Sequence, residues 1–367
     1  MNHVEASAQF RAEMQVFKGL GVSFQEGAPE PSCYLPDEYR FDKELAMDAQ
    51  PGLTTAPNVG IPGLFTTFVD PKVYEVLFTK NQGAVILGEI RRGSWTDDTI
   101  LFPIVEHTGE VVSYGDYSEE GTATANANWP ARQNYIFQTM KQYAERELER
   151  AGKARLNWIG EVDKSAATQL NKFANLSYFY GIGQLLNFGL LNDPNLSAFL
   201  TPAPKAFGNN LWVTGTVVTA TANEIYADIQ SLFLGLVNQS NGLINNRTKT
   251  TLSMSPQSRM ALTATNSFNV NVEDLLQKNF PNIRIEDAVQ YQAINLSNPQ
   301  GYSGGGNIVQ MIADTVDGQE AGFCAYSEKM RSHRIIQAVS SYKQKITSGT
   351  WGAVIRSGFQ LAQMLGV

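Results

Sequence analysis

The most regular pattern of apolar and polar positions lies between about Ala144 and Gly181. Large apolar residues recur there at steps of three and four residues, with Glu, Arg, Lys and Gln between them. This spacing places the apolar side chains on one face of an α-helix. The pattern therefore predicts one long amphipathic helix that ends at Gly181. Gly152 and Gly160 leave open the alternative of two shorter helices, broken at one of these glycines.

Before this helix, the pattern changes to the alternation and short apolar runs that are typical of strands. The run at 84–90 and the stretch at 99–117 both predict strands, and alternation resumes at 134–143. Residues 118–132 contain no large apolar side chain except Trp129, which predicts a polar tip. We therefore expect a long β-hairpin formed by the strands on either side of this tip. Because isolated two-stranded ribbons are marginally stable in water, this hairpin is expected either to project to a neighbouring molecule or to be poorly stable.

Residues from about 190 to 325 are poor in charge and alternate between helical and strand patterns. This alternation indicates a sheet layer covered by helices. The expected helices are 221–237, 255–263 and 272–279, and the expected strands are 250–254, 283–291 and 308–313. The last forty residues return to strand patterns, at 335–339 and 351–355.

The first sixty residues predict an extended arm rather than a domain. Six prolines lie between positions 29 and 62, and they exclude long helices and central strands. Aromatic residues such as Tyr34 and Phe41 lie between these prolines. Their presence favours packing against another surface over the alternative of a disordered tail. Asp70 and Pro71 then predict the start of a short helix, as the N-cap and first-turn residues.

Composition narrows the possible classes of protein. The chain has 367 residues, 43% of them hydrophobic, so two packed lobes are expected rather than one. No apolar run is long enough to span a bilayer and the N-terminus lacks the features of a secretory signal, so we expect no membrane contact and a cytoplasmic location. The net charge is −7, and no run of Lys and Arg exceeds two. This charge disfavours a nucleic-acid-binding surface but suits a wall that encloses DNA without sequence-specific binding.

The residues that carry most enzyme chemistry are sparse. Cys33 and Cys324 are the only cysteines, and their separation excludes a disulfide framework and a CxxC metal site. His107 lies in the expected hairpin and is interpreted as a solvated side chain. The glycine-rich loop 301–307 lacks the Lys-Ser/Thr of a phosphate cradle and precedes an expected strand. We therefore expect no catalytic residue, no cofactor and no metal site. An α/β enzyme that uses loop 301–307 is the alternative from a different class.

Several segments together resemble one known family. They are IPGLFTTFVDPKVYEVLFTKNQGAVIL, TILFPIVEHTGEVVSYGDYSEEG, and YAERELERAG leading to NKFANLSYFYG and FGLLN. These segments are similar to the major capsid proteins of tailed bacteriophages, which have the Hong Kong 97-type fold. The resemblance covers almost the whole chain, and it implies an α+β capsid fold and a shell subunit that is not an enzyme. Encapsulin shells share this fold, so a compartment that houses a cargo enzyme is the alternative.

The resemblance also implies names and boundaries for the parts of the chain. They are an N-terminal arm (1–60), the start of a peripheral domain (61–84), an E-loop β-hairpin (85–140), the peripheral domain with a long spine helix (141–190), an axial domain (191–325) and closing peripheral strands (326–367). In this family, axial domains meet around five-fold and six-fold axes, and the E-loop lies over a neighbour's peripheral domain.

The partners that the resemblance implies are other copies of the chain, in hexamers and pentamers of an icosahedral shell around double-stranded DNA. The arm is too short for a large fused scaffold, so a separate scaffolding protein is implied, together with a portal. Whether a decoration protein also binds the shell is left open by the sequence. The shell is expected to assemble in the host bacterial cytoplasm and to become the virion capsid. The candidate contacts between copies are Arg91, Arg92, Glu110, Asp116, Glu119, Glu120 and Trp129. The alternative for each of them is a solvated side chain.

Overall fold

A computed structural model describes residues 81–154 and 156–367 of the chain. The chain divides into two units, Met1–Leu77 and Phe78–Val367, and every described residue belongs to the second unit. The expected arm and the short helix expected after Asp70 lie outside the described residues. Among the helices that are described, none has both the length and the apolar character needed to cross a membrane.

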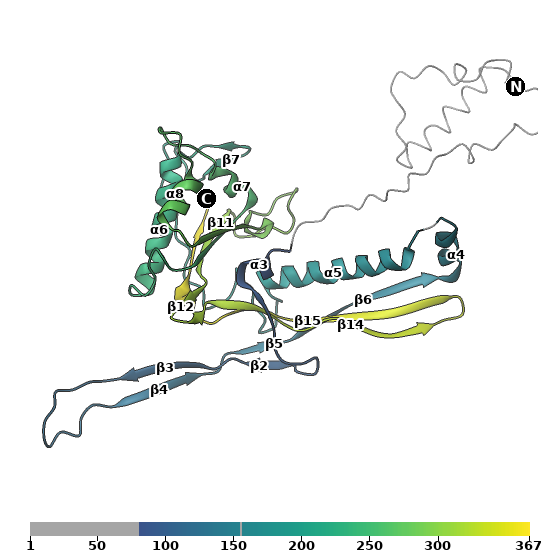
Figure 1. The fold of residues 1–367 in the computed structure, drawn as a ribbon, viewed down its shortest axis with the longest axis horizontal. Coiled ribbons are helices and arrows are strands. Elements are labelled where there is room, and N and C mark those ends of the chain that lie inside the picture. Colours follow the sequence, from purple (N-terminus) through teal and green to yellow (C-terminus); the bar gives the residue numbers. More distant parts are fainter. Residues whose placement is uncertain (1–80, 155) are drawn as a thin grey trace, which may run out of the picture. The chain divides into compact units, whose positions relative to one another are not determined.

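The first sheet has four strands in the order β1-β14-β15-β6 (Figure 1). β1 pairs in parallel with β14, and the other two ladders are antiparallel. The bounds of these strands are Glu89–Arg91 for β1, Tyr135–Ala144 for β6, Gly322–Gln337 for β14 and Ser341–Ile355 for β15. The strand expected at 351–355 is confirmed as the end of β15. β14 covers only the first three residues of the strand expected at 335–339, because the chain turns there into β15.

Two helices, α4 (Glu145–Lys153) and α5 (Trp158–Tyr180), follow β6. The prediction of one long helix is therefore wrong, and the alternative of two shorter helices is correct. The break lies between Lys153 and Trp158, so it is at neither of the two glycines that were expected to cause it. Asn157 caps the new helix: its Oδ1 accepts a hydrogen bond from the N–H three residues later at 3.2 Å. An Asn side chain competes for backbone N–H groups, so it favours a helix start over a helix interior. Gly181 ends α5 as predicted, with a φ of 63°.

The helix α5 covers one face of the first sheet. Ala166 and Leu170 are buried against Ile346 of β15. Phe173 packs on Phe137 of β6, with ring centroids 4.5 Å apart. The apolar periodicity in the sequence therefore identified the buried face of this helix correctly. Full burial of one such side chain stabilises the fold by about 1.5–3 kcal/mol.

The prediction of a strand at 84–90 is wrong for residues 84–87. These residues form a short helix, α3 (Gly83–Leu87), before β1 begins. The Gly83 N–H donates a hydrogen bond to Asn175 Oδ1 of α5 at 2.9 Å, and Ile86 is buried. Packing on α5 thus outweighs the β-propensity of this apolar run, which depends strongly on its surroundings.

The second sheet is mixed, with the strand order β10-β9-β11-β16. β9 pairs in parallel with β10, whereas the β9–β11 and β11–β16 ladders are antiparallel. The strands are β9 (Thr250–Met254), β10 (Ile283–Asp287), β11 (Ile308–Ala313) and β16 (Leu361–Leu365), and the helices of this lobe are α6 (Ala222–Gln239), α7 (Pro256–Ala261) and α8 (Val272–Asn279). Ile225 of α6, Leu252 of β9 and Leu276 of α8 are fully buried in its apolar core.

The sequence predictions for this lobe are largely confirmed. The helices expected at 221–237, 255–263 and 272–279 and the strands expected at 250–254 and 308–313 are all present. Each helix begins after a capping side chain, Thr221, Ser255 or Asn271, that accepts a hydrogen bond from the N–H three residues later. Such caps are readable from the sequence, so these boundaries were predicted well.

The strand expected at 283–291 is too long. β10 ends at Asp287, and a 3₁₀ turn, Val289–Tyr291, follows. The side chain of Tyr291 is buried, and its hydroxyl donates a hydrogen bond to Gln310 Oε1 at 2.7 Å. This buried anchor bends the chain where the apolar pattern alone suggested that the strand continues.

The remaining strands form two-stranded pairs. They are β2 (Thr99–Leu101) with β5 (Ala131–Gln133), β3 (Ile104–Gly109) with β4 (Ala123–Asn128), β7 (Val213–Thr214) with β8 (Val217–Val218), and β12 (Thr315–Val316) with β13 (Gln319–Glu320). A 3₁₀ turn, Gly358–Gln360, precedes β16.

The tip of the expected hairpin is misplaced in the sequence prediction. The turn spans 110–122 instead of 118–132, because 123–128 form strand β4. β4 contains only Ala, Thr and Asn, so its lack of apolar residues suggested a loop. The structure shows why a polar strand forms there: the Thr124 hydroxyl lies 2.9 Å from the Thr108 hydroxyl across the ladder, and such pairs stabilise a ribbon without a core.

The second strand of the expected hairpin has a different partner. The strand at 134–143 is confirmed as β6, but it pairs with β15 and not with 99–117. Its alternate side chains are half-buried or, at Lys141, buried, which agrees with the alternation in the sequence of β6. The pairing joins positions about two hundred residues apart, and alternation along one strand does not identify its partner.

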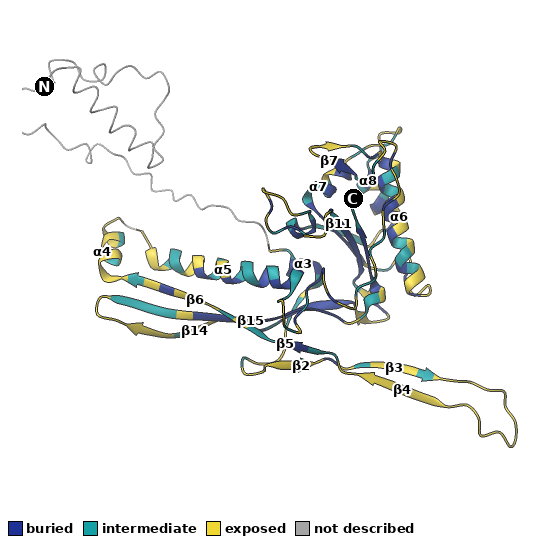
Figure 2. Cartoon of the chain, turned by 180° about the vertical axis from the view of Figure 1, so that it is seen from behind, coloured by how far each residue is buried: buried dark blue, intermediate teal, exposed yellow. Residues whose placement is uncertain are grey.

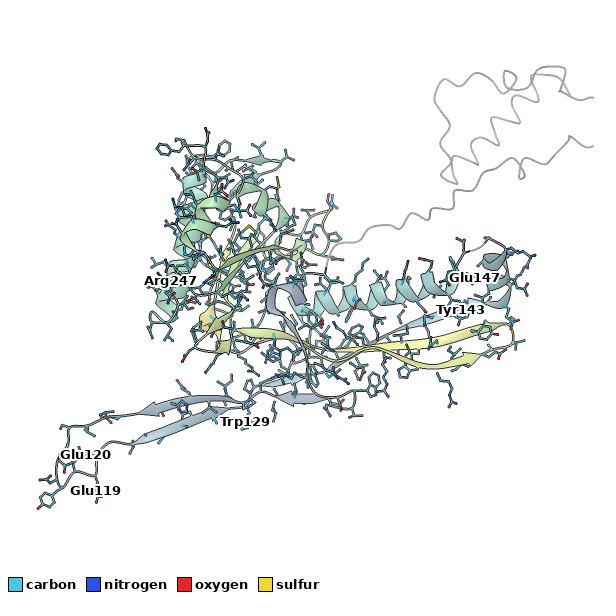
Figure 3. The ribbon with its side chains drawn as sticks, in the orientation of Figure 1. Glu119, Glu120, Trp129, Tyr143, Glu147 and Arg247 are labelled. Atoms are coloured by element: carbon cyan, nitrogen blue, oxygen red, sulfur yellow. The ribbon has the colours of Figure 1, made fainter. Side chains whose placement is uncertain are left out.

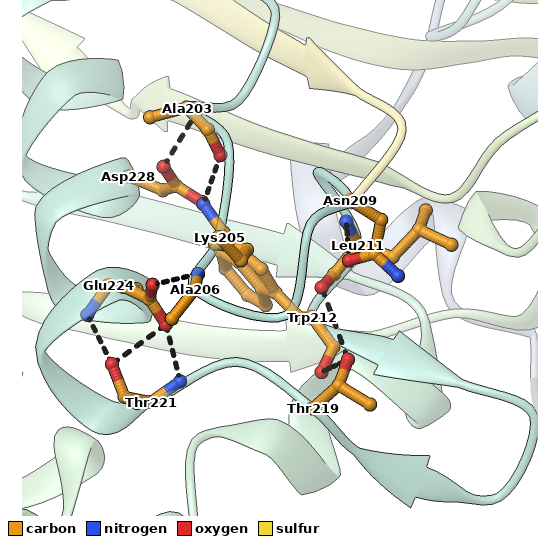
Figure 4. Close-up of polar contacts among 10 residues, drawn as sticks. All are labelled: Ala203, Lys205, Ala206, Asn209, Leu211, Trp212, Thr219, Thr221, Glu224 and Asp228. Atoms are coloured by element: carbon orange, nitrogen blue, oxygen red, sulfur yellow. Dashed lines mark hydrogen bonds and ion pairs between the residues drawn. The ribbon is translucent and has the colours of Figure 1, made fainter.

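A buried ion pair fixes the loop that precedes α6 (Figure 4). Lys205 Nζ is paired with Asp228 Oδ2, and both side chains are at most 3% exposed. Trp212 Nε1 donates a second hydrogen bond to the same carboxylate oxygen at 2.7 Å, and Lys205 also donates to the Ala203 carbonyl at 2.8 Å. These partners offset the cost of removing both charges from water. The network therefore ties the loop to α6.

Candidate subunit interface

The β3–β4 hairpin is exposed along its whole length (Figure 2). Every residue from 105 to 129 is exposed except Thr108, which is half-buried. The ribbon therefore has no apolar core of its own and no face that packs on the rest of the described unit. A two-stranded ribbon of this kind is only marginally stable by itself.

Large apolar and aromatic side chains lie on this exposed ribbon. Val111, Tyr114 and Tyr117 are 99%, 91% and 101% exposed, and Val105 and Trp129 expose more than half of their surface. A single exposed apolar side chain is ordinary, but a group of them on one element is typical of a surface that becomes buried on association. The hairpin is therefore a candidate interface with another molecule.

Glu119 and Glu120 lie at the tip of this hairpin (Figure 3), in the turn 110–122 that also contains Glu110 and Asp116. Glu110, Asp116, Glu119 and Glu120 are all exposed. Asp116 accepts a hydrogen bond from the Tyr114 hydroxyl at 2.9 Å. None of the four acids forms an ion pair with another residue in the described part of the chain. Their charges are thus available to an external partner.

Arg91 and Arg92 lie at β1, and the structure does not bring them together with the tip. Arg91 Nη2 forms an ion pair with Glu328 Oε2 at 3.0 Å, and its Nε donates to the Ser327 carbonyl at 3.2 Å. The Arg92 guanidinium lies over the Phe323 ring, 5.6 Å from its centroid. Both arginines therefore already have partners on β14 of their own chain.

The base of the hairpin is anchored by residues that the sequence analysis missed. Phe102 is buried in a cluster with Phe323 and Trp351, and its ring meets the Phe323 ring edge-on. Its backbone N–H donates to the Pro130 carbonyl at 3.0 Å, which closes the base across the two chain segments. Pro103 and Pro130 interrupt the strand pattern on both sides of the base. Because proline rarely lies inside a strand, these two residues could have indicated where the exposed ribbon ends and its buried base begins.

A buried ion pair supports the same base. Arg132 Nη2 lies 2.8 Å from Asp193 Oδ2, with side chains 5% and 0% exposed. The Arg132 guanidinium also lies over the Phe188 ring at 4.9 Å. Burial raises the pKa of the Asp193 carboxyl, although the Asn195 N–H and the Arg132 charge oppose this shift. This anchor holds the start of the projecting ribbon in a fixed place.

A third link joins β1 to α5 and β14. The Tyr178 hydroxyl of α5 donates to Glu89 Oε1 at 2.5 Å, and Lys329 Nζ of β14 pairs with Glu89 Oε2. Burial and the hydrogen bond to Glu89 raise the pKa of Tyr178 far above its usual value. The phenol therefore stays a neutral donor across the physiological range, and the link does not depend on its titration.

The residues considered for chemistry have structural explanations. His107 is exposed on β3, and His333 Nε2 lies 2.9 Å from Thr347 Oγ1. Cys324 is buried, and burial raises the pKa of its thiol. Loop 301–307 leads into β11, a strand, as predicted. In the described ranges, no group of His, Cys, Asp and Glu side chains is arranged to hold a metal ion.

Comparison with known proteins identifies the family. A family model described as the Pa193 gp26 major capsid protein matches residues 52–366. The chain belongs to this major capsid protein family. The predicted resemblance to tailed-phage capsid proteins is therefore confirmed, and the protein is a major capsid protein. Among curated proteins, no sequence matches this capsid protein.

Solved capsids share the fold of this capsid protein. The capsid of Myoviridae Phage XM1 aligns with a TM-score of 0.65 at 13% identity, covering 84% of this chain and 99% of that chain. The capsid of the native GTA particle aligns with a TM-score of 0.52 at 11% identity, covering 88% and 98%. Mycobacterium phage Ogopogo gives a TM-score of 0.50 at 10% identity, covering 83% and 98%. At these identities the likeness shows the fold alone, which is the predicted mixed helix-and-sheet, Hong Kong 97-like capsid fold.

The compartment alternative has weaker support for this capsid protein. A virus-like particle from Pyrococcus furiosus aligns with a TM-score of 0.43 at 10% identity, covering 76% of this chain and 89% of that chain. A likeness this loose carries no argument for a cargo compartment. The exposed hairpin and its anchored base are thus features of a phage-type capsid protein, and they define its candidate subunit interface.

Proposed function

We propose that copies of this protein assemble into hexamers and pentamers, which close an icosahedral shell around double-stranded phage DNA. Membership of a major capsid protein family supports the shell role. The observation that carries the mode of assembly is the ribbon at 105–129, whose apolar side chains lie in water in the single chain. Such a ribbon gains stability only when another copy buries it, and standard interfaces bury about 1,600 Å² in total.

The hairpin contacts a neighbouring copy through its acids and its aromatic side chains. The residues that we assign to contacts between copies at the hairpin are Glu110, Asp116, Glu119, Glu120 and Trp129. Arg91 and Arg92 belong to the same proposal at β1, where their ion pair and ring contact orient them on β14. Polar contacts of this kind set the register between copies more than they set the affinity.

Each part of the chain has a role in this assembly. Residues 191–325 form the axial domain around the rotation axes, and 85–140 form the E-loop that reaches a neighbour. Residues 61–84, 141–190 and 326–360 form the peripheral domain, and the arm at 1–60 reaches other copies. Leu361–Leu365, expected among the closing peripheral strands, pairs with β11 and packs in the core around α6, so it belongs with the axial lobe. The apolar cluster around α6 and the smaller one between α5 and Ile346 support a division into lobes, and a further cluster packs α5 against β11 where the lobes meet.

The shell acts as a container and not as a catalyst. A chain with a net charge of −7 repels DNA weakly, so the genome moves over the wall without binding to it in a sequence-specific way. The protein uses no cofactor. Its other partners are a separate scaffolding protein and a portal, and assembly takes place in the host bacterial cytoplasm before the shell becomes the virion capsid.

Electron microscopy of the purified chain tests this proposal. At high protein concentration we expect closed shells, sheets or rings, with analytical ultracentrifugation reporting particles of many copies. A matched sample at low concentration serves as the control, because assembly depends on concentration. A particle that stays a compact monomer at every concentration, with and without a co-expressed scaffolding protein, would contradict the proposed function.

A further inference from the structure

A cavity of about 250 Å³, open to solvent, lies between α3 and the second sheet. Its lining comes from α3, from β10 and β11, and from the residues around the short strands β12 and β13. The apolar part of this lining is formed by Val85, Leu87, Ile312 and Ala321. Four charged side chains form much of the remainder. The cavity therefore offers a ligand both an apolar wall and ionic groups, a combination that is typical of sites for small ligands.

Arg284 of β10 brings to this cavity a half-buried guanidinium that has no carboxylate partner among the described residues. Its Nη2 donates hydrogen bonds to the Ile86 carbonyl at 2.9 Å and to the Thr251 hydroxyl at 3.0 Å, and its Nε donates to the same hydroxyl at 3.2 Å. Its Nη1 donates to no described residue. A charge that is partly removed from water is stabilised by a counter-ion, so Arg284 favours an anion in the cavity.

The other charged side chains of the cavity limit the charge that such an anion can carry. Lys249 Nζ lies 3.8 Å from Asp314 Oδ2, and Asp314 Oδ1 accepts a hydrogen bond from the Thr251 hydroxyl at 2.6 Å. Glu320 is exposed on β13. The two cations and the two acids of the lining cancel, so a doubly charged anion such as phosphate gains little from the cavity as a whole. A single negative charge beside Arg284 is the better fit, because this is the cation without a carboxylate partner.

We propose that this cavity binds a carboxylate that is carried on a short apolar stem. The carboxylate accepts hydrogen bonds from Arg284 Nη1 and is attracted by Lys249, and the stem packs on Val85 and Leu87. A guanidinium and a carboxylate form a planar pair with charge-assisted hydrogen bonds, which an ammonium does not provide. Both a free short-chain carboxylate and the C-terminal residue of a peptide have this chemistry. The site is separate from the proposed contacts between copies, because no residue of the β3–β4 hairpin lines it.

A ligand in this cavity contacts two parts of the fold at once. Val85 and Leu87 belong to α3, which is held on α5 by a hydrogen bond, whereas Arg284 belongs to the second sheet. The hydrogen bond from Arg284 to the Ile86 carbonyl already joins these two parts. A ligand that binds the native chain and not the unfolded chain raises the unfolding temperature, by an amount that grows with its concentration. Binding is therefore measurable both as heat and as a gain in thermal stability.

Titration calorimetry of the unassembled chain with sodium butanoate tests the site. We expect saturable binding, and a rise in unfolding temperature of about 2 °C when butanoate is about tenfold above its dissociation constant. Butanamide has the stem without the charge and acetate has the charge with a shorter stem, so each should bind at least about fivefold more weakly. Sodium chloride at the same ionic strength is the control for general salt effects. Equal binding of butanoate and butanamide, or no saturable binding of butanoate, overturns the inference.

Two substitutions test the residues assigned to this site. Arg284→Met should abolish butanoate binding, and Lys249→Met should weaken it by about threefold. Lys278→Met, at an exposed site on α8 outside the cavity, is the matched control and should bind butanoate like the native chain. Circular dichroism verifies that each variant is folded. The Lys249 side chain is 65% exposed, so its variant should fold even if the Arg284 variant does not. Native affinity in Lys249→Met, or in a folded Arg284→Met, contradicts the assignment.

A short capped peptide that ends in a free leucine carboxylate distinguishes the two sources of the ligand. The same peptide with a C-terminal amide is its control. Tighter binding of the peptide acid than of butanoate supports a protein C-terminus as the ligand, whereas binding of butanoate and not of the peptide supports a free carboxylate. Tighter binding of inorganic phosphate than of butanoate would contradict a ligand with a single charge. None of these outcomes alters the expected formation of shells, so failure of this inference leaves the proposed function intact.

Discussion

At the scale of single residues, the buried carboxylate of Asp228 has the largest predicted effect on stability. It accepts hydrogen bonds from the Lys205 ammonium and from Trp212 Nε1. Asp228→Ala leaves the buried ammonium without its counter-charge, so the free energy of unfolding is expected to fall by about 3–5 kcal/mol. Urea denaturation of the unassembled chain measures this change. Asp98→Ala, at an exposed site, is the control and should change stability by less than about 0.5 kcal/mol. Equal effects of the two substitutions would contradict the assigned role of the network.

Glu224 gives a prediction for the pH dependence of stability. Its carboxylate accepts hydrogen bonds from the Thr221 N–H at 2.8 Å and the Ala206 N–H at 2.7 Å, and these bonds lower its pKa. A lowered native pKa means that the stabilising contribution is complete above the unfolded value of about 4.3 and is lost as the pH falls through the native pKa.

Glu224→Gln removes the titrating group at this helix start. The native chain should therefore unfold at a higher temperature than the variant near pH 6, and the difference should shrink as the pH falls below the unfolded value of about 4.3. Differential scanning calorimetry of the unassembled chain over this pH range measures the difference. A gap in unfolding temperature that is the same at every pH would show that the carboxylate charge is not responsible.

The sequence identified some of these residues and not others. Glu119 and Glu120 could be recognised from the sequence as exposed residues, because charged residues within a polar stretch are usually solvated. The Arg132–Asp193 pair was missed because its members are 61 positions apart and each is isolated among uncharged residues. Nothing in the pattern around a single Arg indicates whether a buried partner exists elsewhere in the chain.

At the scale of elements, helices with capping side chains were predicted well. For the helix at 272–279, the sequence shows both the N-cap residue, Asn271, and the acidic residues of the first turn, Glu273 and Asp274. In contrast, the helix α3 and the strand β4 were missed. The first depends on packing against α5, and the second is a polar strand whose partner strand is its main support in this chain. Both depend on tertiary context, which local propensity does not contain.

The hairpin tip gives a prediction at this scale. Val111→Ser, Tyr114→Ser and Tyr117→Ser together remove apolar side chains that are almost fully exposed in the single chain. The unfolding temperature of the unassembled chain should therefore stay nearly unchanged, because these side chains bury no surface there. Assembly should be lost, because their burial between copies is lost.

Light scattering and calorimetry on the same samples separate these two effects. Ser113→Ala, Ser118→Ala and Thr122→Ala on the same tip form a matched control that keeps the apolar side chains, and it should assemble like the native chain. Normal assembly of the triple-Ser variant would exclude the apolar tip from the interface. A large loss of thermal stability would instead show that the tip is buried within its own chain.

At the scale of the whole molecule, the order of elements was more informative than any single motif. The long hairpin, the helices that follow it and the mixed lobe together predicted the capsid fold, and the family match over 52–366 confirmed it. The pairing of β6 with β15 was not predictable, since it joins segments about two hundred residues apart in the sequence. Such long-range pairings depend on the packing of the whole fold. They also determine which face of the first sheet is left exposed.

The central claim is that the exposed ribbon at 105–129 becomes buried on other copies when the shell forms. Cryo-electron microscopy of the assembled particle, at a resolution that shows side chains, tests it most directly. The account predicts that Val111, Tyr114 and Tyr117 of each copy are buried against a neighbouring copy. A reconstruction in which the ribbon folds back on its own chain, or remains in solvent with no contact to a neighbour, would contradict it.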